Sequence, residues 1–145
     1  MRSCSGLLSL ASAAGLLLAP GLAAAQGAPP VRIDVMVSYI SSQPGSVDPR
    51  AQRLHEQLRR DLAYKSLRVL QMQRMLLNLD ERRGLKLPNG RQLWIRPILV
   101  DERGILAAIE VGDYRSDQRL YKRRLWVYGG ERYLDGKLVI SLEPD

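Results

Sequence analysis

The sequence contains one cysteine, one histidine and no phenylalanine among its 145 residues. A single cysteine, Cys4, cannot form a disulfide within the chain. A single histidine, His55, excludes any metal site that needs two imidazoles from one chain, and a Ser-His-Asp triad would have to use His55 itself. Neither the calcium-loop spacing nor a phosphate-binding glycine motif is present. We therefore predict no catalytic residue, no metal site and no cofactor.

The start of the chain also has very little charge, since Arg2 is the only charged residue before position 32. Arg2 is followed by an apolar run over residues 6–20 and by the small residues Ala23-Ala24-Ala25. These three parts are typical of a secretory signal peptide, and we expect cleavage after Ala25. An uncleaved membrane anchor is the alternative, but the run is short for a span and is interrupted by Pro20. Cys4 precedes the apolar run, so it leaves with the signal rather than carrying a lipid.

This pattern predicts three segments: a signal peptide at residues 1–25, a flexible leader at 26–30 and a single exported domain at 31–145. Removal of the signal leaves 120 of the 145 residues, enough for one hydrophobic core. The whole chain has 22 lysines and arginines against 15 acidic residues, and the loss of Arg2 leaves a net charge of +6. We expect a basic protein in the periplasm or outside the cell, with no transmembrane span after cleavage.

The first half of the domain predicts a strand and then a helix. Alternation from Val31 to Ile40, with β-branched residues at every second position, is typical of a strand. Asp48-Pro49 is a helix-start signal. An apolar stripe of helical spacing follows, which consists of Ala51, Leu54, Leu58 and Leu62. This stripe predicts one amphipathic helix that ends near residue 63.

The second half predicts strands joined by short turns. Residues 66–80 suit either a helix or a long or bulged strand, and the neighbouring strands favour the strand. Asn89-Gly90 predicts a tight primed turn between arms at 85–87 and 91–100, and Pro97 predicts an edge or a bulge. Further strands are expected at 105–111, 119–128 and 137–142, with Gly129-Gly130 ending the second of these. The fold class is thus α+β: mostly antiparallel β, with about six or seven strands in a meander or sandwich and one N-terminal amphipathic helix.

Several weak motifs together resemble a family of small secreted bacterial proteins of unassigned activity. The motifs are the signal peptide, the first strand, the Val47-Asp48-Pro49 helix start, the Leu87-Pro88-Asn89-Gly90 hairpin and the closing segment from Gly129 to Ile140. The resemblance covers most of the chain after the signal. It implies an exported, mostly β domain and supplies no reaction or catalytic residue.

One expected strand combines basic and aromatic side chains. Arginine and aromatic rings together suit anionic or sugar-bearing partners, through paired hydrogen bonds and ring stacking. Alternation predicts that Arg119, Tyr121 and Arg123 share one face of this strand. Nucleic acid is not expected as the partner, because the signal peptide directs the chain out of the cytoplasm. The candidate binding surface is Arg119, Tyr121, Lys122, Arg123, Arg124 and Trp126. The two tryptophans, Trp94 and Trp126, are predicted to be core anchors.

Acidic residues fall in the expected turns, as Asp80-Glu81, Asp101-Glu102 and Glu131 with Asp135. Glycosidases need two facing carboxylates, but these acids lie among arginines and are interpreted as solvated turn charges. His55, beside the apolar stripe, is interpreted as a boundary residue of the helix. The sequence therefore predicts a non-enzymatic exported domain that binds an envelope protein or an anionic cell-surface polymer. The alternative is an extracytoplasmic hydrolase that uses the turn carboxylates.

Overall fold

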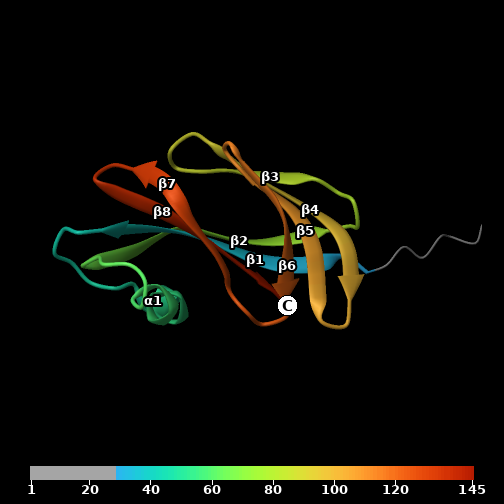
Figure 1. The fold of residues 1–145 in the computed structure, drawn as a ribbon, viewed down its shortest axis with the longest axis horizontal. Coiled ribbons are helices and arrows are strands. Elements are labelled where there is room, and N and C mark those ends of the chain that lie inside the picture. Colours follow the sequence, from blue (N-terminus) through green and yellow to red (C-terminus); the bar gives the residue numbers. More distant parts are fainter. Residues whose placement is uncertain (1–28) are drawn as a thin grey trace, which may run out of the picture.

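The computed structural model describes residues 29–145, and the predicted signal peptide at 1–25 lies outside the described residues. The chain forms eight strands in two four-stranded antiparallel sheets, with one short helical segment between the first two strands (Figure 1). The α+β class predicted from the sequence is therefore wrong, because the fold is mostly β. The expected six or seven strands are also too few, and the helix follows the first strand instead of standing at the N-terminal end of the fold.

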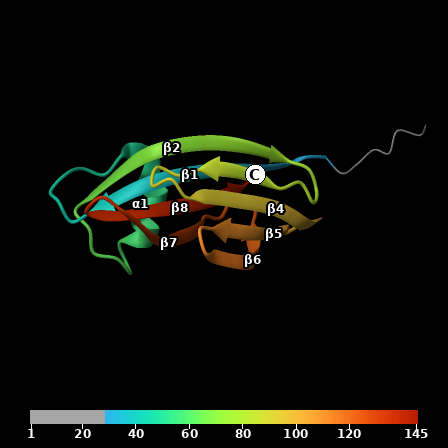
Figure 2. The same cartoon turned by 90° about the horizontal axis from the view of Figure 1, so that it is seen from above.

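The first sheet, called sheet 1, contains both ends of the described chain. Its strand order is β2-β1-β8-β7, so the last strand lies in the middle beside the first (Figure 2). The register places Ile33 opposite Pro144 and Ile40 opposite Lys137. The strands are β1 (Val31–Ser41), β2 (Ser66–Leu77), β7 (Trp126–Tyr133) and β8 (Gly136–Pro144).

The second sheet, called sheet 2, is a meander in chain order, β3-β4-β5-β6. Each strand pairs with the next in sequence, and the first hairpin closes with a hydrogen bond of 2.8 Å from the N–H of Leu87 to the carbonyl oxygen of Arg91. Only Gly90 in that loop has a positive φ, of 85°. The loop is therefore longer than the primed two-residue turn that Asn89-Gly90 predicted. The strands are β3 (Arg83–Lys86), β4 (Gln92–Asp101), β5 (Gly104–Val111) and β6 (Tyr114–Tyr121).

The main core lies between the two sheets, because alternate side chains of both sheets point inward. From sheet 1 it includes Ile33 and Ile140, and from sheet 2 it includes Ile95 and Ile109, all without exposed surface. The expected alternation of the first strand is confirmed over Val31, Ile33, Val35 and Val37. The chain crosses between the sheets twice, after β2 and after β6.

A second, smaller core covers the outer face of sheet 1. The helical segment begins as a 3-10 turn (Pro49–Ala51) and continues as α1 (Gln52–Leu58), which seats Leu54 and Leu58 on Ile40, Leu67 and Val139. The predicted Asp48 cap is confirmed, since its side chain accepts a hydrogen bond of 3.0 Å from the N–H of Arg50. The helix stops five residues before the predicted end. No helix in residues 29–145 is long and apolar enough to cross a membrane.

Strand β2 explains why its sequence suited two interpretations. Its pairing with β1 shifts between Val69 and Gln71, which is a β-bulge. Odd-numbered side chains before the bulge, at Leu67 and Val69, pack on the helix side, whereas odd-numbered side chains after it, at Met75 and Leu77, enter the main core. The expected long or bulged strand is confirmed.

Bulges also account for Pro97 and for the miscounted strands. The β4–β5 register shifts after Pro97, which confirms the bulge expected there. The β7–β8 register shifts between Gly129 and Glu131, so this glycine pair makes a bulge within β7 and does not end the strand as predicted. Residues 112–118, which lie between two expected strands, are mostly strand, because β6 begins at Tyr114.

Candidate functional site

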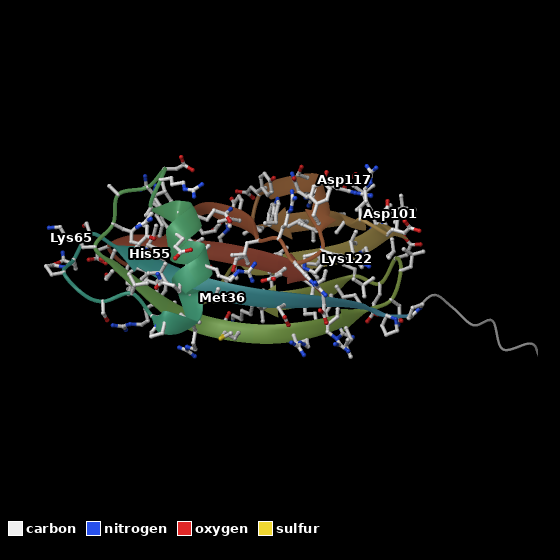
Figure 3. All side chains as sticks on the ribbon, turned by 90° about the horizontal axis from the view of Figure 1, so that it is seen from below. Met36, His55, Lys65, Asp101, Asp117 and Lys122 are labelled. Atoms are coloured by element: carbon white, nitrogen blue, oxygen red, sulfur yellow. The ribbon has the colours of Figure 1, made fainter. Side chains whose placement is uncertain are left out.

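The predicted binding surface does not lie on one strand. Strand β6 ends at Tyr121 and β7 begins at Trp126, so residues 122–125 form the connection from sheet 2 to sheet 1. We call these four residues the basic loop. The prediction that Arg119, Tyr121 and Arg123 share one strand face is therefore wrong for Arg123, whereas Arg119 and Tyr121 both lie on β6. In Figure 3, Lys122 lies near the end of the molecule that holds Asp101, away from Lys65 at the opposite end.

The backbone of the basic loop is held by hydrogen bonds on every side. The N–H of Lys122 donates to the carbonyl oxygen of Arg103 at 3.1 Å, and that of Arg123 donates to Pro144 at 2.9 Å. The guanidinium of Arg53, from the helix, donates to the carbonyl oxygen of Arg123 at 3.1 Å. A fixed backbone reduces the conformational entropy that the loop loses on binding a partner.

Arg123 has an unusual backbone conformation in this loop. Its φ is 60°, in the left-handed region that favours glycine. The turn is closed by a hydrogen bond of 3.1 Å from the N–H of Arg124 to the carbonyl oxygen of Tyr121, which places Lys122 and Arg123 at the two central positions. A non-glycine residue in this conformation costs roughly 1 kcal/mol. The loop therefore keeps an arginine where a glycine would be less strained.

Among residues 29–145, the cationic side chains of the basic loop have no acidic partner, unlike most of the arginines there. Within residues 29–145, ten arginines form ion pairs with carboxylates. Lys122, Arg123 and Arg124 form none in that part of the chain, and all three are exposed. The ring of Tyr121 is also exposed, and the Arg124 guanidinium lies 5.8 Å from its centroid. These three cations are thus available to an anionic partner.

Two members of the predicted surface are engaged elsewhere. Arg119 forms an ion pair with Asp101, and the hydrogen bond from Arg119 is the main reason that the pKa of Asp101 lies below its usual value. Trp126 packs partly against the main core, and its indole N–H donates to Gln118 at 3.3 Å. The core-anchor prediction is thus correct in part for Trp126. Lys122, Arg123 and Arg124, with Tyr121 beside them, remain as the basic surface.

Trp94 is not a core anchor. Its ring lies on the outer face of sheet 2, against Gly84 of the neighbouring strand, with the Arg82 guanidinium 3.9 Å from the ring centroid. Arg82 also pairs with Glu110 at 2.7 Å, and this hydrogen bond is the main reason that the pKa of Glu110 is lowered. This face is a network of paired charges around one ring.

Most of the turn carboxylates are paired with cations or used in local hydrogen bonds. Asp80 lies 3.7 Å from Arg96, and Glu81 lies 2.8 Å from Arg83. The pKa of Glu81 is lowered, chiefly because its carboxylate accepts the N–H of Asn78. A general acid needs a raised pKa. The lowered pKa values of Glu81 and Asp101 therefore favour structural roles for these acids.

Two of the remaining acids, Glu131 and Asp135, also have local partners. Asp135 accepts hydrogen bonds from Tyr39 and Ser41. Glu131, only 4% exposed, accepts a hydrogen bond of 3.0 Å from the amide of Asn89 and lies 3.5 Å from Arg91. These contacts join the β3–β4 turn to β7.

The single histidine also has a local partner. Nδ1 of His55 lies 2.7 Å from the hydroxyl of Tyr64, which follows the helix end. Burial raises the pKa of Tyr64. Within the described part of the chain, no group of three His, Cys, Asp or Glu side chains is placed to hold a metal ion. The helix-boundary interpretation of His55 fits this arrangement.

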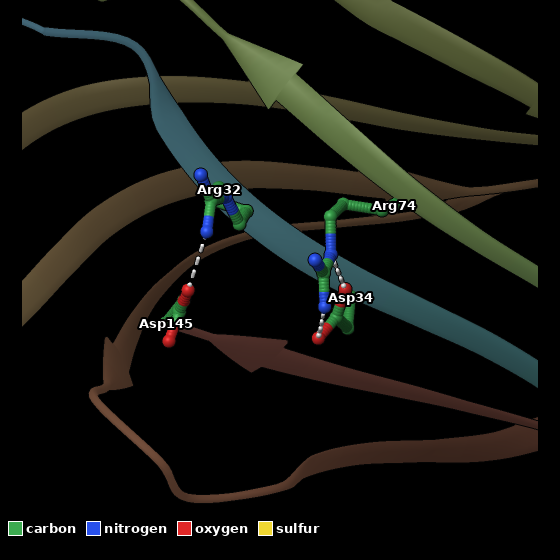
Figure 4. A network of polar contacts seen from close by, with 4 residues as sticks. All are labelled: Arg32, Asp34, Arg74 and Asp145. Carbon is green, nitrogen blue, oxygen red and sulfur yellow. Dashed lines mark hydrogen bonds and ion pairs between the residues drawn. The ribbon is translucent and has the colours of Figure 1, made fainter.

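Ion pairs also cover the outer face of sheet 1 beyond the helix. Arg32 pairs with Asp145 at 3.0 Å and Arg74 pairs with Asp34 at 2.7 Å (Figure 4). A groove of about 500 Å³ runs between these residues and the helix and is lined by Met36 and Met72 among others. The charges at its rim are paired, so they favour neither an anionic nor a cationic ligand.

A cavity of about 600 Å³ lies beside the loop between β1 and the helix. Its acidic groups are already occupied: Asp135 accepts from Tyr39 and Ser41, and Asp48 pairs with Arg50 at 2.7 Å. Arg68 is the one lining cation without an ion pair within residues 29–145, so the lining offers a single free charge and no set of free groups.

Comparisons of the chain with protein-family models, curated proteins and solved structures found no significant match. The resemblance to small secreted bacterial proteins therefore stays a prediction. The basic loop stands out within residues 29–145 because it combines a hydrogen-bonded backbone with three consecutive cations that form no ion pair there.

Proposed function

We propose that this protein is a non-enzymatic, exported domain that binds an anionic polymer of the cell surface through the basic loop. The observation that carries the proposal is the set of three consecutive exposed cations without acidic partners among residues 29–145, in a protein where most arginines are paired. Free cations do not have to give up an internal ion pair when they meet an anion. The export part of the proposal rests on the sequence pattern of residues 1–25.

The loop's geometry favours a binding role over a purely structural one. Its hydrogen bonds use backbone atoms and Arg53, so removing the loop's own charges should leave its path intact. The strained φ of Arg123 also supports the proposal, since strained residues cluster at functional sites. Because the sequence predicts export, we favour a polymer of the cell surface over nucleic acid as the partner. An acidic envelope protein is the competing partner.

The test measures binding of the purified full chain to polygalacturonate, a polymer with one carboxylate per sugar, with neutral dextran as a negative control. The test variant is Lys122→Gln, Arg123→Gln, Arg124→Gln. The matched control is Arg59→Gln, Arg60→Gln, Lys65→Gln, which removes the same charge from exposed residues that also form no ion pair within the described residues. Each exposed charge contact contributes up to about 1 kcal/mol, so we expect affinity to fall about tenfold in the test variant only.

Binding should also weaken as salt rises, because exposed charges are screened within about 8 to 10 Å at ordinary ionic strength. Equal loss in both variants would show that total charge matters and the basic loop does not, which contradicts the proposal. Binding to an acidic protein without any binding to polygalacturonate would replace the polymer with the competing partner.

A further inference from the structure

Three aromatic rings from the two unpaired strand edges nearest the basic loop lie in a row. Trp126 and Tyr128 alternate along β7, with ring centroids 6.4 Å apart and planes 9° from parallel. Tyr114, from the start of β6, lies 4.7 Å from Tyr128. Each of the three residues remains partly exposed. We call Trp126, Tyr128 and Tyr114 the aromatic strip.

The strip crosses from one sheet to the other through side chains. Strands β6 and β7 are edges of different sheets, so no backbone ladder joins them. The amide of Gln118 links the rings: its nitrogen donates to the Tyr114 hydroxyl at 3.1 Å and to Ser116 at 2.7 Å, while its oxygen accepts from Trp126. Hydroxyl and amide groups therefore lie directly beside partly exposed ring surface.

Rings bordered by amide and hydroxyl groups match the surface chemistry of a sugar. The C–H groups of a pyranose are weakly positive and pack on the negative face of an aromatic ring, while its hydroxyls exchange hydrogen bonds with amides and hydroxyls. An extended peptide would pair with the free backbone groups of these two strand edges and would not require the rings.

The strip follows the basic loop directly in the chain, since Trp126 comes after Leu125, although Leu125 packs on the helix side of sheet 1 and Trp126 packs on the main core. We propose that the aromatic strip holds sugar rings of an anionic polysaccharide whose acidic groups meet Lys122, Arg123 and Arg124. This inference rests on the proposed function and names the class of polymer. It assigns selectivity to the rings and charge attraction to the loop.

The two tryptophans of the chain provide an internal reporter. In the full-chain variant Trp94→Tyr, Trp126 is the only tryptophan left, and the ring on Gly84 is retained. Saturating polygalacturonate should reduce acrylamide quenching of Trp126 fluorescence by about twofold or more. Polyglutamate, which also carries one carboxylate per unit but has no sugar, should bind the basic loop and leave the quenching unchanged.

Affinity gives a second, independent measurement. The original chain should bind polygalacturonate about fivefold more tightly than polyglutamate at the same salt, since one aromatic contact contributes about 1 kcal/mol. Trp126→Leu should remove this preference, and Trp94→Leu is the matched control that should keep it. Tyr114→Ser, at a residue outside the main core, should also lower the preference and guards against misfolding of Trp126→Leu.

The outcomes separate the two proposals. Equal affinity for both polymers with no protection of Trp126 overturns the polysaccharide inference and leaves the basic loop as a site for polyanions. Protection of Trp126 by polyglutamate also overturns it and favours an acidic peptide. Absence of binding to either polymer overturns both proposals.

Discussion

The ring of Trp94 lies so close to Gly84 that a Cβ added at Gly84 would stand 2.6 Å from the Cζ3 atom of the ring. The two residues are opposite each other in the β3–β4 hairpin. The glycine thus gives the ring its place on the outer face of sheet 2, an arrangement in which an aromatic side chain covers a strand glycine on the neighbouring strand.

Gly84→Ala should lower the free energy of unfolding by about 1 to 3 kcal/mol, because the ring has to move or the hairpin has to open. Gly129→Ala is the matched control in another strand, where the new Cβ would be 3.7 Å from Val139, an ordinary contact. Urea denaturation measures both. Equal stability of the two variants would contradict the close packing of Trp94 on Gly84.

Arg123→Gly should raise the free energy of unfolding by about 0.5 kcal/mol, because glycine adopts the positive φ without strain. The same variant should bind polygalacturonate more weakly, since one free cation is lost. Arg124→Gly removes a neighbouring charge at a residue without positive φ, so it should weaken binding without any gain in stability. A loss of stability in Arg123→Gly would show that the side chain supports the loop.

Leu58→Ala should destabilise the protein by roughly 2 to 5 kcal/mol, because Leu58 is buried in the small core between the helix and sheet 1. Leu62→Ala, at a partly buried position beyond the helix end, should cost less. Denaturant melts followed by circular dichroism measure the difference. A change of less than about 0.5 kcal/mol for Leu58→Ala would mean that the helix is not docked on the sheet.

The helix start should respond to acid. Hydrogen bonds from the Arg50 side chain and backbone lower the pKa of Asp48 from its usual value near 3.8 to about 2. A carboxyl group whose pKa is lowered on folding contributes stability that is complete above its unfolded pKa and is lost as pH falls through the folded pKa. We therefore expect this contribution to be present above about pH 4 and to disappear towards pH 2.

Nuclear magnetic resonance titration of the Asp48 carboxyl group measures this pKa directly. Asp48→Asn keeps a capping side chain without the titrating group, so its stability should vary less between pH 4 and pH 2. A midpoint near 3.8 in the folded protein would contradict the bonds to Arg50.

Local patterns predicted several elements correctly, for identifiable reasons. The first strand alternates without interruption, and Asp48-Pro49 places the helix start within one residue. The helix end was missed because the spacing of Leu62 continues the apolar stripe, whereas the chain has to turn there to begin β2. Tyr64 contacts His55 across this turn, and no periodicity encodes such a contact.

The composition of the sequence predicted the basic residues of this surface, but it did not predict that they lie in a loop. Residues 119–128 have the composition of one strand, and only the pairing of β6 and β7 with different partners shows the break at residue 122. Tyr114 was expected close to a turn, because residues 112–117 contain turn-forming and polar types, and Gln118 was missed. An alternating pattern could have indicated strand β6, but its residues are weakly hydrophobic. They are Tyr114, Ser116, Gln118 and Leu120.

The position of the last strand determines when the molecule can fold. Strand β8 lies between β1 and β7, so residues about a hundred positions apart have to meet before sheet 1 exists. Sheet 2 consists of consecutive hairpins, so it can form before β1 and β8 pair. The pairing of β1 with β8 is expected to be slower, because pairings between distant residues are slow to form. A nascent chain that has not yet reached residue 136 therefore lacks the strand that joins β1 to β7, and one that stops there leaves the inner edges of β1 and β7 open to other chains.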